Sequence, residues 1–97
     1  MDPTSKYVIV RGDRSGVFAG NLEFQADRKV VLSKCRRLWY WDGAASLHQL
    51  AKEGVKNPRD CKFTVTVDSI TLLDAIEIIP TTAEAEAIIK AVPEWKM

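Results

Sequence analysis

Three apolar runs separated by polar turns make up most of the first 41 positions. The runs are rich in β-branched and aromatic residues, which favour strands, and they lie at residues 7–10, 17–24 and 30–41. Gly12 and Gly16 stand in the first connection, where they are free to adopt the backbone conformations that tight turns need. The pattern predicts three strands that follow one another as an antiparallel meander.

Two details predict that this meander is irregular. Gly20 lies inside the second run, and a glycine within a strand often marks a bulge or a close approach of another backbone. The third run has no consistent polar face, because both sets of alternating residues begin apolar, become polar or basic and end aromatic. A simple sheet with one face in water gives clean alternation. We therefore expect the third strand to be strongly twisted or curled.

The middle of the chain predicts a short helix followed by a strand. Ser46 and Gln49 have the spacing of a capping box, and Gly54 stands where a left-handed C-terminal cap belongs. The clearest alternation in the chain then predicts a strand, with apolar positions at Phe63, Val65 and Val67.

The last third predicts one or two buried strands and a closing helix. Residues 68–69 (Asp-Ser) are expected to break the chain before an apolar stretch at residues 70–79. Thr81 and Glu84 have a second capping-box spacing, and apolar residues follow at helical intervals at Ala85, Ile88, Ile89 and Val92. The predicted fold is α+β: a small, antiparallel, strongly twisted sheet of about five strands, with a short middle helix and a C-terminal helix.

Length and composition indicate one globular domain, residues 1–97. Hydrophobic residues make up 46% and charged residues 28% of the 97 positions, which is ordinary for a folded domain. No apolar run approaches the ~18 residues of a membrane span, and the N-terminus does not read as a signal peptide. A net charge of +1 excludes a strong overall attraction to nucleic acid or membranes, although it permits a local basic patch.

Cysteine and histidine content argues against a metal site, and we also expect no cofactor. Cys35 and Cys61 are far apart in sequence, and His48 is the only histidine of the chain. A structural zinc site needs four such ligands. We expect both thiols to be reduced and to act as small buried hydrophobic groups, although the sequence leaves a disulfide open.

Catalysis has little support in the sequence, so we expect no enzyme. Ser46 and His48 are two positions apart on a predicted helix, and side chains at that spacing point in different directions. Glu84 and Glu86 are better explained as acidic residues favoured at a helix N-terminus. Neither a Walker-type phosphate loop nor a Gly-x-Gly-x-x-Gly motif is present.

The most unusual chemistry lies at the end of the third run, where Arg36, Arg37, Trp39 and Trp41 stand close together. Arginine can bind phosphate in a forked geometry, and both residue types stack on a base. The same residues are enriched at protein–protein hot spots, and in a small domain they can also be core or surface residues. A second basic segment contains Arg11 and Arg14. Its glycines could let N–H groups surround an anion, although a plain hairpin turn explains them as well.

Several stretches of the chain resemble a known family. They include residues 36–47 (Arg-Arg-Leu-Trp-Tyr-Trp-Asp-Gly-Ala-Ala-Ser-Leu), residues 77–80 (Glu-Ile-Ile-Pro) and residues 92–96 (Val-Pro-Glu-Trp-Lys). The sequence is similar to a family of small phage and prophage proteins that is known only as a domain of unknown function. The resemblance brings no residue roles with it. It implies a phage accessory protein that acts in the cytoplasm of a host bacterium.

This setting favours a binding protein that sequesters a nucleotide-derived immune signal of the host, of the cyclic oligonucleotide or cyclic ADP-ribose type. The expected ligand site is a pocket formed in a homo-oligomer and lined by Arg11, Arg14, Arg36, Arg37, Trp39, Trp41 and Trp95. The alternatives are an inhibitor that binds a host defence or regulatory protein and, less favoured by the net charge, a protein that binds single-stranded nucleic acid.

Overall fold

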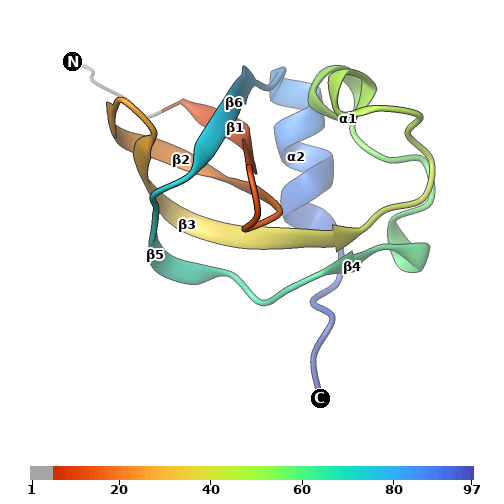
Figure 1. Ribbon diagram of the computed structural model, residues 1–97. Coiled ribbons are helices and arrows are strands. Elements are labelled where there is room, and N and C mark those ends of the chain that lie inside the picture. The colour runs from red at the N-terminus through yellow and green to blue at the C-terminus, as the bar shows by residue number, and fades with distance from the viewer. Residues whose placement is uncertain (1–5) are drawn as a thin grey trace.

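The computed structural model describes residues 6–97 and confirms an α+β fold built on one antiparallel sheet (Figure 1). The sheet has six strands, against about five expected from the sequence. In chain order the elements are β1 (Tyr7–Gly12), β2 (Val17–Ala26), β3 (Lys29–Tyr40), α1 (Leu47–Glu53), a 3-10 turn (Pro58–Asp60), β4 (Lys62–Phe63), β5 (Val67–Leu72), β6 (Ala75–Pro80) and α2 (Ala83–Ala91).

The sheet is strongly curled. Its strand order is β4-β3-β2-β1-β6, and β5 pairs with β3 on the same edge as β4. Only Leu73 and Asp74 separate β5 from β6, although these two strands lie at opposite ends of the strand order. The main-chain N–H of Ala75, the first residue of β6, donates to the carbonyl of Arg28 in the turn between β2 and β3, at 3.1 Å.

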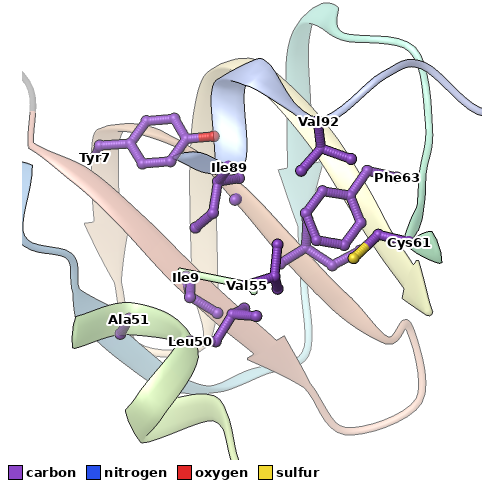
Figure 2. Close-up of a cluster of buried hydrophobic side chains, with 11 residues drawn as sticks. Tyr7, Ile9, Leu50, Ala51, Val55, Cys61, Phe63, Ile89 and Val92 are labelled. Carbon is purple, nitrogen blue, oxygen red and sulfur yellow. The ribbon is translucent and has the colours of Figure 1, made fainter. Parts of the chain in front are cut away.

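Both faces of β1 are buried, which explains why the first apolar run, residues 7–10, contains no polar position. On one face, Tyr7 and Ile9 of β1 pack with the two helices, in a cluster that includes Leu50, Ala51 and Ile89 (Figure 2). The alternate residues of β1, Val8 and Val10, belong to a second cluster enclosed by the curled strands. A strand that is buried on both sides reads as a continuous apolar run.

Side-chain caps define where the two helices begin. The hydroxyl oxygen of Ser46 accepts the N–H of Gln49 at 3.2 Å, as the sequence predicted. Gly54 ends α1 with a positive φ of 77°, but its ψ of −152° differs from that of the left-handed cap that was expected. The predicted start of the second helix is wrong by one residue, because Thr82 is its N-cap and accepts the N–H of Ala85 at 3.0 Å. The Thr81 hydroxyl donates instead to the carbonyl of Tyr7 on β1.

A bulge in β3 explains the close approach that Gly20 predicted. Ala19 pairs with Arg36 and Asn21 with Ser33, so Gly20 faces two residues, Lys34 and Cys35. Lys34 has a φ of 48°, and a Cβ on Gly20 would lie 3.0 Å from the Cα of Cys35. The extra residue reverses the alternation of side chains in the second half of β3.

Two sequence predictions about the later strands are wrong. The expected strand through Phe63, Val65 and Val67 is interrupted, because β4 ends at Phe63 and β5 begins at Val67. Each of these strands pairs with a different half of the bulged β3, so the chain between them cannot continue one regular ladder. The expected break at residues 68–69 lies inside β5, on a solvent-exposed edge that tolerates polar residues. The true break is the two-residue turn before β6.

Arg36 is buried and links β3 to β4 and α2. Only 3% of this residue is exposed. Its guanidinium donates four hydrogen bonds of 2.9–3.2 Å, all to main-chain carbonyls, at Phe63, Thr64, Ile89 and Val92. Ile89 and Val92 lie at the C-terminal end of α2, where carbonyls lack helical partners and a cation is favoured. Burial lowers the pKa of the guanidinium, which nevertheless stays protonated.

Asp74 fastens the turn between β1 and β2 to the turn between β5 and β6. Its carboxylate accepts the N–H groups of Arg14 and Ser15 at 2.8 and 3.0 Å and the Ser15 hydroxyl at 2.7 Å. A Cβ on Gly12 would lie 1.9 Å from the Ser15 oxygen, so the turn needs glycine there. The hydrogen bonds from Arg14 and then from Ser15 lower the pKa of Asp74.

We predict that Arg36→Met lowers the free energy of unfolding by about 3 kcal/mol, because it removes the donors of four carbonyls, most of them buried. Urea denaturation of the full chain measures this loss. Arg59→Met is the matched control: Arg59 is exposed on the 3-10 turn, and its replacement should cost less than about 0.5 kcal/mol. Similar losses in the two variants would contradict the role of Arg36.

We predict that Asp74→Asn removes part of the acid sensitivity of the fold. An unstructured Asp has a pKa of about 3.9, and that of folded Asp74 is lower. The ionised carboxylate therefore stabilises the fold above about pH 4, and this contribution is lost as the pH falls through the folded pKa. The control is Asp68→Asn, because the Asp68 side chain is 97% exposed. Between pH 7 and pH 2, the free energy of unfolding should fall less steeply in Asp74→Asn than in this control. Identical pH profiles would refute the prediction.

Candidate functional site

Four of the seven predicted site residues line one hollow, which we call the Arg–Trp hollow. Its volume is about 310 Å³. The turn between β1 and β2 supplies Arg14, Ser15 and Gly16, and the end of β3 with the residue that follows supplies Arg37, Trp39 and Trp41. Arg14 and Arg37 give the hollow two cations, and the two indoles give it flat apolar walls.

Arg37 is held in place by both its backbone and its side chain. Its N–H donates to the Thr64 hydroxyl at 2.9 Å, and its carbonyl accepts the N–H of Thr64 at 3.0 Å. The guanidinium carbon lies 4.7 Å from the centroid of the Phe18 ring, on the strand that pairs with β3. This cation–π contact orients the side chain and leaves it part of the wall of the hollow.

Trp39 and Trp95 form a stacked pair beside the hollow, which we call the Trp pair. Their ring centroids are 6.5 Å apart, and their planes differ by 15°. The two residues remain 61% and 47% exposed. The ammonium group of Lys62 lies 5.4 Å from the centroid of the Trp95 ring. Trp39 belongs both to this pair and to the lining of the hollow, so the pair extends the site toward the C-terminal tail.

The other two predicted residues have different surroundings. Arg36 is buried, and its four hydrogen bonds to carbonyls leave it unavailable to a ligand in this structure. Arg11 forms an ion pair with Glu77 of β6, with 2.7 Å between its Nε and the carboxylate. We therefore leave Arg36 and Arg11 out of the candidate site.

The anion cradle considered for the glycine-containing turn is occupied by the protein itself. The N–H groups of Arg14 and Ser15 point to the Asp74 carboxylate, so they are not available to an external anion. What the turn offers to the Arg–Trp hollow is the Arg14 side chain, together with Ser15 and Gly16.

The two cysteines lie in separate core clusters. Cys35 belongs to the cluster inside the curled sheet and Cys61 to the cluster beneath the helices, and both are free. Burial raises the pKa of Cys35 to about 12, so its thiol is protonated at neutral pH. Their burial confirms the sequence prediction that they act as small hydrophobic groups.

Sequence reasoning missed a second, larger hollow of about 510 Å³, lined mainly by residues 56–60 with Ala91 and Pro93. No motif marks it, because its walls come from two segments that are distant in the sequence. Lys62 was missed for the same reason, since only the tertiary fold places it on Trp95. Across residues 6–97, no three His, Cys, Asp or Glu side chains come together as potential metal ligands. The helices of that same part of the chain are too short or too polar to cross a membrane.

The lining of the Arg–Trp hollow offers groups that suit an anion and groups that suit a flat ring. The two guanidinium groups suit phosphate oxygens, and the indoles suit the faces of a heteroaromatic ring. None of the residues that line it is a His, Cys, Asp, Glu or Lys, so the wall carries no ordinary general acid or base.

Comparison with known proteins identifies a family. The model of the family described as "Domain of unknown function (DUF6948)" matches residues 5–89, a range that contains the whole lining of the Arg–Trp hollow but ends before Trp95. Searches of curated proteins and of solved structures found no match. Because the matched range covers most of the chain, the protein belongs to the DUF6948 family.

Proposed function

We propose that the protein binds a nucleotide-derived signalling molecule in the Arg–Trp hollow and holds it without chemical change. The observation that carries this proposal is the convergence of Arg14, Arg37, Trp39 and Trp41 on one hollow from two separate segments of the chain. In the setting implied by the resemblance to phage proteins, the protein is a counter-defence factor. It would sequester a cyclic oligonucleotide or cyclic ADP-ribose-type signal in the cytoplasm of the host bacterium.

The chemistry of the lining supports binding rather than catalysis. A nucleotide brings phosphates that arginine recognises in a forked geometry and a base that stacks on indole. A hydrolase would also need a group to activate water, and the described lining offers only arginine, serine and apolar residues. The proposed action is therefore stoichiometric, one site occupied for each molecule removed from solution.

The size of the hollow favours a homo-oligomer. About 310 Å³ is at the lower end of the volumes of ligand pockets, and the hollow is open to solvent. A cyclic dinucleotide would extend beyond it. A second copy of the chain placed over the opening would enclose the rest of the ligand, because symmetric assemblies present the same surface twice.

A second candidate function is inhibition of a host protein. Trp39 at the end of β3 and Trp95 in the tail are 61% and 47% exposed and stack on each other. Exposed aromatic residues next to arginine have the composition of a binding hot spot. In that case the surface would engage a protein, and a host partner would be recovered with the purified chain in stoichiometric amount.

We predict that Arg37→Met and Arg14→Met each weaken nucleotide binding at least ~10-fold, the loss expected for one charge-assisted contact to phosphate. Met keeps an unbranched aliphatic side chain at position 37 and removes the cation, together with its contact with the Phe18 ring. Native mass spectrometry with a panel of cyclic oligonucleotides and ADP-ribose derivatives identifies the ligand, and calorimetry then gives its affinity.

The control is Arg59→Met, which removes an exposed cation outside the Arg–Trp hollow and should leave the affinity unchanged. Heating the complex should release the ligand with its mass intact. A changed mass would establish an enzyme instead. Failure of the wild-type chain to bind any member of the panel would shift the assignment to the protein-inhibitor function.

A further inference from the structure

The Trp pair has a geometry that the Arg–Trp hollow alone does not explain. Trp39 and Trp95 are large, nearly parallel rings, yet each remains about half exposed. Burial of a large aromatic side chain normally stabilises a small domain. These two are held on the outside of the sheet, next to two arginines, where a flat ligand can reach them.

Both rings are held by defined backbone contacts. Trp39 lies at an irregularity of the β3–β4 pairing, between Leu38 and Tyr40. The tail that carries Trp95 runs beside β4, where the N–H of Trp95 donates to the carbonyl of Phe63 at 2.8 Å. In Figure 1 the tail leaves the end of α2, passes β4 and continues away from the sheet. The spacing of the rings therefore follows from the strand pairing and is not set by the indoles alone.

The pair is open to a flat ligand. Its ring centroids are 6.5 Å apart, its planes differ by 15°, and about half of each residue is exposed. A base can therefore stack on the exposed indole surface of the pair, next to the arginines of the hollow.

We propose that the Trp pair binds the base of the nucleotide whose phosphates lie in the Arg–Trp hollow. This inference rests on the proposed function and adds the class of ligand, a nucleoside phosphate. Its phosphates would contact the arginines of the hollow, and its base would contact the Trp pair. Trp39 connects the two parts, because it belongs to both. The Lys62 ammonium lies 5.4 Å from the centroid of the Trp95 ring and adds a positive charge beside it.

The test compares a ligand that has a base with one that lacks it. The probes are ADP-ribose, which carries adenine and a diphosphate, and ribose 5-phosphate, which carries only the phosphate part. Calorimetry gives both dissociation constants for the full chain and for Trp95→Leu and Trp95→Phe. Trp95→Leu should weaken ADP-ribose binding about 10-fold, because stacking on one aromatic side chain is lost, and leave ribose 5-phosphate unchanged. Trp95→Phe, which keeps a flat ring, should retain most of the affinity.

The outcomes separate this inference from the function on which it rests. If Trp95→Leu binds ADP-ribose as tightly as the wild type while Arg37→Met does not, the function stands and the base site is refuted. If Trp95→Leu weakens both probes equally, Trp95 acts through the fold and the base site is again refuted. If the wild-type chain binds neither probe nor any nucleotide of the panel, both proposals fail together.

Discussion

The buried guanidinium of Arg36 is the interaction on which most of the architecture depends. It joins three segments that are distant in sequence, because its hydrogen bonds run from β3 to carbonyls beside β4 and at the end of α2. All four of these acceptors are main-chain carbonyls, so carbonyl dipoles and the negative end of the α2 dipole, together with the charge of Glu94, balance the charge of the guanidinium. The position of α2 determines where the tail leaves the fold. Arg36 therefore helps to place Trp95, although it contacts no part of the candidate site.

The adjacent residue, Arg37, shows what the sequence could and could not reveal. Strand and helix positions follow from apolar periodicity and from caps such as Ser46, and these predictions are largely confirmed. The roles of the two arginines cannot be separated by composition, since both are cations in one strand. Their separation depends on which face each occupies, and the bulge at Lys34 shifts that alternation by one residue. Period-two reasoning assumes that no such bulge exists.

The site depends on contacts that no local pattern encodes. Arg14 faces the end of β3 because the turn that carries it is tied to Asp74, a residue about sixty positions later. The Asp74 carboxylate also accepts two N–H groups of the turn. Only side chains of the turn therefore remain to attract an anionic ligand. The segment 36–41 contains Arg37, Trp39 and Trp41, which the fold brings to the Arg–Trp hollow, whereas the larger hollow around residues 56–60 had no sequence signal. Tertiary contacts, rather than motifs, decide which cations remain free for a ligand.

Nuclear magnetic resonance of the guanidinium and indole N–H groups during nucleotide titration tests the central claim most directly, with Arg36 as an internal reference. We predict that the Nε–H signal of Arg37 and the indole signals of Trp39 and Trp41 shift in proportion to occupancy. The Nε–H signal of Arg36 should stay in place, because it is bonded to the carbonyl of Thr64. Shifts confined to residues around 56–60, with Arg37 and the tryptophans unchanged, would contradict the assignment of the Arg–Trp hollow as the ligand site.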